Sequence, residues 1–137
     1  MMSVVMRRGA LPFATLALGA CTSISASPAT FDNTQWRVVA INDEPTPLLP
    51  NYRMAFAKGQ VSGQFGCNHF GGGYRVRGDT LTTGAVSMTE MACSGPGDHF
   101  EGLGLAVLTQ SMRLNWTSDR RLTLANAAGS IALERLP

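Results

Sequence analysis

The sequence predicts a mostly β domain, a small antiparallel and barrel-like curved sheet of about eight strands with one packed α-helix. After residue 35, apolar and polar residues alternate with a period of two over most of the chain, which is the pattern of half-buried strands. Short segments rich in Gly, Asn and Asp separate the alternating stretches, as in antiparallel hairpins. Seven glycines from Gly59 to Gly78 indicate the bends and bulges of a strongly curved sheet.

The N-terminal segment has the features of an export signal. Residues 1–9 contain Arg7 and Arg8 but no acidic residue, and residues 10–20 are uncharged and mostly apolar. An apolar helix of this length would rise only about 16 Å, whereas the hydrocarbon core of a bilayer is about 30 Å thick. We therefore interpret residues 1–20 as a signal peptide rather than a membrane span.

The end of this segment, Leu18-Gly19-Ala20-Cys21, resembles the lipobox of bacterial lipoproteins. The resemblance implies that Cys21 carries lipid on its sulfur and becomes the first mature residue, so that acyl chains anchor the protein to a membrane. Thr22 rather than Asp follows Cys21, which by the same resemblance favours the outer membrane, with the protein facing the periplasm. The alternative is an ordinary signal peptide that is cleaved near Ala20, with Cys21 incidental.

Between this cysteine and the first strand, residues 22–30 are small and polar and include one proline. Such residues bury little surface, so we expect residues 21–33 to form a lipidated tether. The folded domain is then expected over residues 34–137.

The expected strands are defined by the residues that share their inward faces. Turns are expected at Lys58-Gly59, Gly78-Asp79, Ser118-Asp119 and Asn126 to Gly129, because these residue types tolerate tight or left-handed backbone. Along the chain, the inward residues are Trp36, Val38 and Ala40; Tyr52, Met54 and Phe56; Val61, Gly63 and Phe65; Phe70, Gly72, Tyr74 and Val76; Leu114 and Trp116; Leu122 and Leu124; and Ile131 and Leu133.

One helix is expected from about Pro96, where the missing N–H of proline is no loss in the first turn. Asp98 and Glu101 place negative charge near its N-terminus, as the helix dipole favours. An apolar stripe at helical spacing should pack on the open face of the sheet; it consists of Phe100, Leu103, Val107 and Leu108.

The charge balance argues against nucleic-acid binding. The chain has 11 Lys and Arg residues against 9 Asp and Glu residues, and its formal charge of +2 comes from Arg7 and Arg8 in the export segment. The mature chain is therefore formally neutral. It has no basic cluster beyond the pair Arg120-Arg121, so we expect no nucleic-acid partner.

Two sequence motifs resemble those of a known family. The first is Val61-Ser62-Gly63-Gln64-Phe65-Gly66-Cys67-Asn68-His69-Phe70, followed by Tyr74, Gly78, Leu81 and Gly84, and the second is Thr89-Glu90-Met91-Ala92-Cys93. With Trp36 opening the domain, they resemble the META domain of HslJ-type heat-shock lipoproteins over roughly residues 34–135. This chain has Ser94-Gly95 before Pro96, where relatives often place Pro directly after the Cys, so the helix start is open by a residue or two.

The resemblance implies a compact barrel-like sheet with a helix, and an envelope role in stress or antibiotic tolerance. It implies no enzymatic activity and no cofactor. Two further hypotheses stay open. One is a carrier of lipid or another hydrophobic ligand inside an incompletely closed barrel. The other is an inhibitor-like or pilot-like adaptor that presents a loop to an envelope protein.

The remaining cysteines, Cys67 and Cys93, are expected to form a disulfide, because an exported protein meets an oxidising compartment. The alternative is two buried free thiols that act as small apolar residues. A nucleophilic Cys67 with His69 as its base is disfavoured, because nothing fixes the two side chains to meet. We interpret His69 as an exposed residue beside a structural cysteine.

Soft metal ligands are present, because Met88, Met91, His69 and His99 could in principle bind copper. Methionines of a small domain more often fill gaps in the core, so we expect no metal site.

Overall fold

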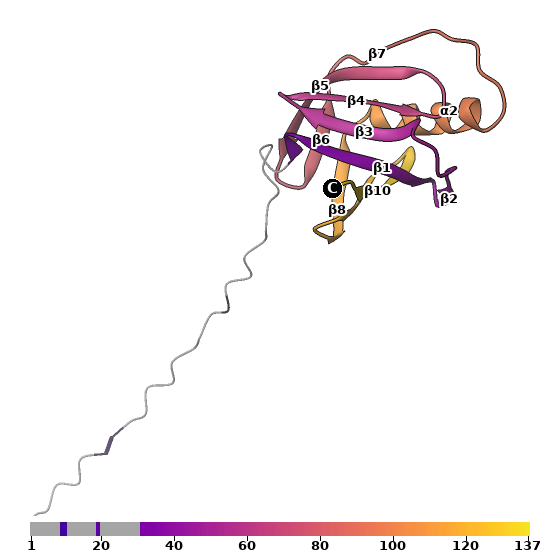
Figure 1. Cartoon of the computed structure of the whole chain (residues 1–137). Coiled ribbons are helices and arrows are strands. Elements are labelled where there is room, and N and C mark those ends of the chain that lie inside the picture. The colour runs from indigo at the N-terminus through magenta and orange to yellow at the C-terminus, as the bar shows by residue number, and fades with distance from the viewer. Residues whose placement is uncertain (1–8, 11–18, 20–30) are drawn as a thin grey trace, which may run out of the picture.

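The computed structural model describes residues 9–10, 19 and 31–137, and in the folded part it confirms a mostly β barrel with one helix (Figure 1). The elements are β1 (Thr34–Ile41), β2 (Glu44–Pro45), β3 (Tyr52–Ala57), β4 (Gln60–Phe65), β5 (His69–Arg77), β6 (Thr80–Thr83), β7 (Ser87–Met88), α2 (Pro96–Leu108), β8 (Met112–Ser118), β9 (Arg121–Asn126) and β10 (Gly129–Arg135). No helix among the described residues has the length and apolar character that crossing a bilayer requires.

The sheet closes on itself as an antiparallel barrel. Its strands follow the order β1, β3, β4, β5, β6, β8, β9 and β10, and β10 pairs again with β1 from Trp36↔Arg135 to Ile41↔Ile131. The short strands β2 and β7 add to β1 and β5 without joining the ring. Of the strand pairs that form the ring, β6 and β8 have the fewest paired residues, only two. Residues 84–111 leave the barrel between these two strands.

Because neighbouring strands are antiparallel, the connections alternate between the two ends of the barrel. We call one end the entry end. It holds residues 31–33, the turns 58–59, 78–79 and 119–120, and residues 136–137. We call the other the helix end, which holds the connections 42–51, 66–68, 84–111 and 127–128. In Figure 1 β1 runs from the entry end towards β2, near the end where α2 lies.

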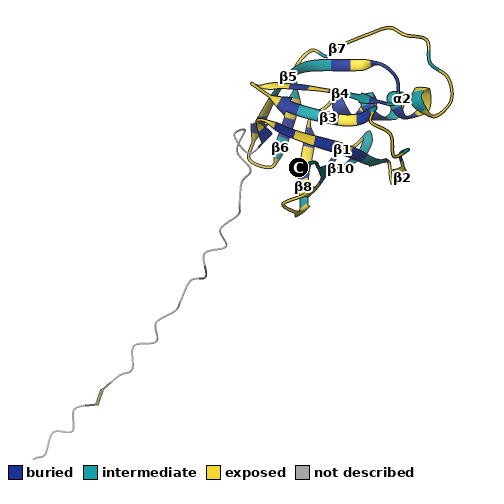
Figure 2. Cartoon of the chain, viewed as in Figure 1, coloured by how far each residue is buried: buried dark blue, intermediate teal, exposed yellow. Residues whose placement is uncertain are grey.

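Apolar side chains fill the interior of the barrel, as the alternation predicts. Figure 2 shows buried and exposed residues alternating along the ribbon of the strands. Trp36, Met54, Phe56, Val61 and Phe65 are all fully buried. The inward face of β1 differs from the prediction, because Ile41 rather than Ala40 is buried at its end. A β-bulge between Val38 and Ala40 inserts one residue and reverses the phase of the alternation.

The folded domain begins earlier than expected. Phe31, which the sequence assigns to the tether of residues 21–33, is fully buried and its ring contacts those of Phe56, Tyr74 and Trp116. The neighbouring Asp32 carboxylate accepts hydrogen bonds from Tyr74 Oη at 2.7 Å and from the Gly59 amide at 3.3 Å. A lone aromatic residue beyond polar sequence has no periodicity to mark it, so its burial was not foreseen.

The helix covers the helix end of the barrel instead of an open face, because the closed sheet has none. Phe100 packs on Tyr52 at the start of β3, and Gly104 lies against the Phe65 ring at the end of β4. The last turn accepts hydrogen bonds from Asn126, at the end of β9, and from Thr83, at the end of β6. Four strand ends are thereby tied to one helix.

Candidate functional site

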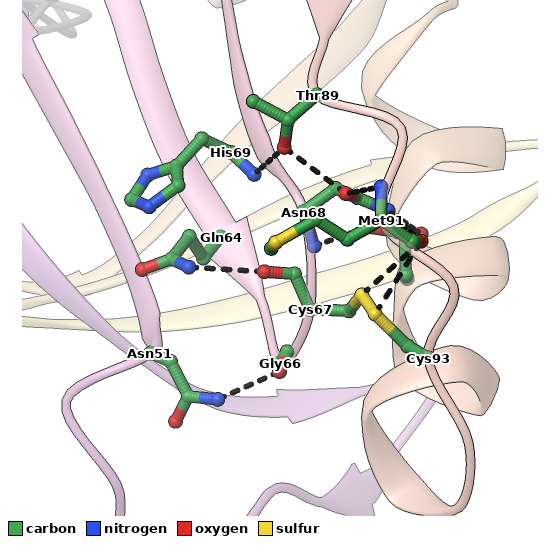
Figure 3. The surroundings of a disulfide bond; sticks show 10 residues. Asn51, Gln64, Gly66, Cys67, Asn68, His69, Thr89, Met91 and Cys93 are labelled. Atoms are coloured by element: carbon green, nitrogen blue, oxygen red, sulfur yellow. Dashed lines mark hydrogen bonds between the residues drawn. A yellow bond between two sulfur atoms is a disulfide. The ribbon is translucent and has the colours of Figure 1, made fainter.

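The candidate site lies at the helix end, where a disulfide joins two connections. Cys67, just after β4, is bonded to Cys93, just before α2, with the two Cα atoms 6.1 Å apart (Figure 3). This confirms the predicted disulfide. It closes a loop of 26 residues in sequence separation, and on the chain-entropy model such a loop stabilises the fold by about 3.5 kcal/mol.

Asn68 connects three segments at this site. Its backbone amide donates to Glu101 Oε1 of α2 at 2.7 Å, and its Nδ2 donates to Glu101 Oε2 at 3.1 Å and to the Met91 carbonyl at 3.2 Å. Its Oδ1 accepts from the Met91 amide at 2.7 Å and from Thr89 Oγ1 at 3.0 Å. Since Asn68 is only 5% exposed, these bonds fix the segment before Cys93 against both the barrel and the helix.

The role of Glu101 differs from the one that its position suggested. The sequence placed it near the helix N-terminus as a favourable charge, but its carboxylate receives two hydrogen bonds from Asn68 across the site. No periodicity or spacing links an Asn in one connection with a Glu in a helix 33 residues later. In the sequence, the only local indication that Asn68 has a structural role is its position next to Cys67 of the predicted disulfide.

Close backbone contact sets the distance between the helix start and the barrel. Gly66 has a φ of 103°, and a Cβ there would lie 2.5 Å from Tyr52 Oη and 2.7 Å from the Gly97 Cα. The Asn51 side chain also donates to the Gly66 carbonyl at 2.6 Å. Residues 51, 66 and 97 are therefore tightly packed against one another next to the disulfide.

The disulfide removes the thiolate on which a nucleophilic Cys67 would depend. His69 is exposed at the start of β5, and its ring points away from the two sulfurs in Figure 3. Its amide donates to Thr89 Oγ1 at 3.0 Å, so the contact that it makes here is through the backbone. The interpretation of His69 as an exposed residue beside a structural cysteine is confirmed.

The four soft ligands considered for copper are not all brought to one place, because His69 and Met88 line one open surface groove whereas His99 lies against Glu44. His99 Nε2 lies 2.8 Å from Glu44 Oε2, which ties α2 to β2. Met91 contacts Asn68 through its backbone, and Met88 pairs with Phe70 in the sheet. In residues 9–10, 19 and 31–137 there is no group of three or more His, Cys, Asp or Glu residues placed to hold a metal ion.

Exposed apolar side chains mark the same end of the molecule. Leu48 and Leu49 are 81% and 54% exposed in the connection between β2 and β3, where Pro47 and Pro50 flank them. Met91 is 55% exposed beside the disulfide. The helix end thus presents apolar side chains on a backbone held by a disulfide, prolines and buried hydrogen bonds, an arrangement suited to contact with another molecule.

The larger grooves lie along the barrel wall instead. One of about 490 Å³ is lined by Gly73, Arg75, Arg77, Thr80 and Thr82 of β5 and β6, among others. A second of about 310 Å³ runs over β1, β3 and β4 and includes Arg53 and His69. Both are open surface grooves, and the interior between the strands is occupied by the buried core.

The predicted lipidation site, Cys21, lies outside the described residues. Its modification therefore stays a prediction.

Comparison with known proteins identifies the domain type. The family model of the META domain matches residues 29–135, a range that includes the buried Phe31. One solved NMR structure has a TM-score of 0.69 at 22% sequence identity and covers 80% of this chain and 94% of its own. An NMR structure of a protein from Burkholderia xenovorans has a TM-score of 0.60 at 22% identity, covering 92% of this chain and 99% of its own. At this identity the likeness shows the fold alone. No curated protein matches the chain.

Proposed function

This chain belongs to the META domain family, and from that premise we propose that it is a lipid-anchored envelope protein of the HslJ type with a non-catalytic domain. Its anchor is the lipid on Cys21, and its place is the periplasmic face of the outer membrane. Its role is an accessory binding function in envelope stress or antibiotic tolerance.

The observation that carries this proposal is the Cys67–Cys93 disulfide in a chain whose residues 1–20 have the composition expected of an export signal. Disulfides persist in oxidising compartments such as the periplasm and are rare in the cytosol. The lipobox-like residues 18–21 add the means of attachment. Because the fold begins at or before Phe31, the tether that remains after Cys21 has at most nine residues, 22–30.

The side chains of the candidate site support binding rather than catalysis. The META domain is not a known catalytic family. At the helix end the sulfurs are bonded to each other, and the half-buried carboxylate of Glu101 accepts two hydrogen bonds from Asn68. These groups hold the backbone in place. A rigid backbone that presents apolar side chains favours docking of a partner, because little conformational entropy is lost on binding.

The anchor is tested by detergent phase separation of the full chain expressed in a bacterium. The wild-type protein should enter the detergent phase, and the Cys21→Ser variant should enter the aqueous phase, because the acyl chains are absent. Thr22→Ala is the matched control and should behave as the wild type. A Cys21→Ser variant that still enters the detergent phase would contradict lipid anchoring at this residue.

Within the binding role, one observation favours the adaptor over the hydrophobic-ligand carrier. The barrel interior is filled by Phe31, Trp36, Phe56 and other fully buried side chains, whereas Leu48 and Leu49 project outward between prolines. Crosslinking in intact cells from a photoreactive residue at position 48 should give a discrete partner band. The same residue at position 119, in the exposed turn between β8 and β9 at the entry end, is the control that should give none. Native mass spectrometry that finds co-purified lipid on the delipidated domain would instead favour the carrier.

A further inference from the structure

Charge is segregated between the two ends of this formally neutral domain. The four connections of the helix end contain no Lys or Arg, although the longest runs over residues 84–111. They carry the five carboxylates of Asp43, Glu44, Glu90, Asp98 and Glu101. This end therefore has a formal charge of −5.

The barrel strands and the entry end carry the opposite charge. They hold all nine basic residues that follow residue 30, against four acidic ones, which gives a formal charge of +5. At the turns and termini of the entry end the basic residues are Lys58, Arg77, Arg120, Arg121 and Arg135, and the acidic residues are Asp32, Asp79, Asp119 and Glu134, so this end by itself has a formal charge of +1. Arg113, which is paired with Thr80 beside the turn 78–79, raises this charge to +2.

Local pairing neutralises only part of this basic end. Arg113 lies 3.3 Å from Asp79, and Arg121 lies 3.6 Å from Glu134, both as exposed pairs. In the part of the chain that the structure describes, Lys58, Arg77 and Arg120 have no carboxylate within ion-pair distance. Residues 1–30 contain no Asp or Glu that could supply one.

A neutral body with separated charges is attracted to a charged surface when only one of its ends is within the screening distance. The Debye length is about 8 Å at physiological ionic strength. A strand of eight residues such as β1 is about 26 Å long, so the acidic helix end lies beyond this distance when the entry end touches the surface. The basic end is then attracted while the repulsion of the acidic end is screened.

The chain also enters the barrel at the basic end. Phe31 and Asp32 are fixed beside the turn 58–59, and the uncharged residues 22–30 could reach at most about 30 Å from Cys21. We propose that the entry end lies on the anionic headgroups of the bilayer that holds the lipid anchor. The helix end, with its disulfide and exposed apolar side chains, then faces away from the membrane. This inference rests on the proposed lipid anchor.

Energy transfer from the domain to the membrane tests this orientation. In the lipidated protein Cys21 is acylated and Cys67 is bonded to Cys93, so that one added cysteine is the only free thiol. Ala57→Cys labels the entry end and Ala127→Cys labels the helix end, and both alanines are exposed. Each labelled protein is placed in vesicles of phosphatidylcholine, with or without phosphatidylglycerol, that contain an acceptor lipid.

In vesicles with phosphatidylglycerol, we expect transfer efficiency from position 57 to be several-fold higher than from position 127. The difference should shrink in pure phosphatidylcholine, and also in 1 M salt, where the Debye length falls to about 3 Å. Replacing Arg120→Gln together with Arg121→Gln should reduce the difference. The matched pair Glu90→Gln with Asp98→Asn removes two charges at the other end and should leave it unchanged.

The outcomes separate this inference from the anchor on which it rests. Protein that floats with the vesicles but transfers energy equally from both positions, or more from position 127, keeps the anchor and overturns the orientation. A difference that is independent of phosphatidylglycerol and of salt also overturns it, because the tether alone would then set the orientation. Protein that does not float with the vesicles contradicts both the anchor and the orientation.

Discussion

Asn68 shows how one buried polar side chain can organise a binding surface. Every polar atom of its side chain has a partner, and these partners lie in the 84–95 connection and in α2. The disulfide next to it fixes the same connection covalently at Cys93. Two attachments a few residues apart, one covalent and one through hydrogen bonds, therefore hold the backbone at Met91.

Replacing Asn68 by alanine should lower the free energy of unfolding by about 2 kcal/mol, because it removes four part-buried hydrogen bonds of the side chain, one of them to a carboxylate. Asn115→Ala, at an exposed position of β8, is the control and should change it by less than about 0.5 kcal/mol. Urea denaturation of both oxidised variants measures the difference. Equal stability of the two would show that the Asn68 network contributes little.

The ionisation of Tyr74, which is hydrogen-bonded to Asp32 at the entry end, makes the stability of the barrel depend on pH. Burial, the hydrogen bond to Asp32 and the charge of that carboxylate raise the pKa of Tyr74 well above the usual value of 10.0, and burial also raises the pKa of Tyr52. Because the folded chain holds these protons more tightly than the unfolded chain, stability is fully present below about pH 10 and falls as the pH rises further.

The two tyrosines are the only ones in the sequence, so tyrosinate absorbance reports on them alone. In an alkaline titration we expect this absorbance to rise together with the loss of circular dichroism, at a pH above the ordinary pKa of 10.0. Tyr74→Phe should weaken the dependence of stability on pH in this range. Tyrosinate that forms near pH 10 in a chain with intact circular dichroism would contradict the raised pKa values.

At the scale of elements, α2 contains two glycines with opposite surroundings. A Cβ at Gly104 would lie 2.5 to 2.8 Å from atoms of the Phe65 ring, whereas a Cβ at Gly102 meets nothing within 4 Å. Helix propensity alone favours alanine at both positions by about 1 kcal/mol. Packing therefore decides which of the two glycines is required.

We expect Gly102→Ala to raise the free energy of unfolding by about 0.5 to 1 kcal/mol and Gly104→Ala to lower it by about 1 to 3 kcal/mol. Thermal or urea unfolding of the two variants provides the comparison. If Gly104→Ala were as stable as Gly102→Ala, the helix would not be seated on Phe65 as described.

The strands and the helix could be predicted because their evidence is local. Period-two alternation places Trp36, Met54, Phe56 and Phe65 inside, and Pro96 marks the helix start. The bulge in β1 was not predictable, because alternation continues formally through Ala40 and only the pairing with β10 shows the shift. Phe31 was missed for a similar reason, since its partners Phe56 and Trp116 come from distant parts of the chain.

At the scale of the molecule, closure of the barrel depends on the pairing of β1 with β10, the first and last strands. Strand patterns indicate curvature but not which edges meet, so a closed or a merely curled sheet remained open from sequence. Closure with a filled interior removes the internal volume that a carrier would use. What the molecule offers to a partner is therefore its surface.

The segregation of charge is also a property of the whole fold. In sequence order the acidic and basic residues simply alternate in small groups, and the net charge after residue 20 is zero. Only the antiparallel topology, which sends every second connection to the same end, gathers the five carboxylates at the helix end. The net charge taken from composition alone would therefore predict no attraction of this domain to a charged surface.

Intact mass spectrometry of the protein purified from bacterial membranes tests the proposal that lipid on Cys21 holds this META domain at a membrane. We expect a mature chain that begins at Cys21, carries the added mass of acyl chains and lacks two hydrogens for the Cys67–Cys93 bond. A soluble, unacylated chain that still begins at residue 1 or 2 would contradict it.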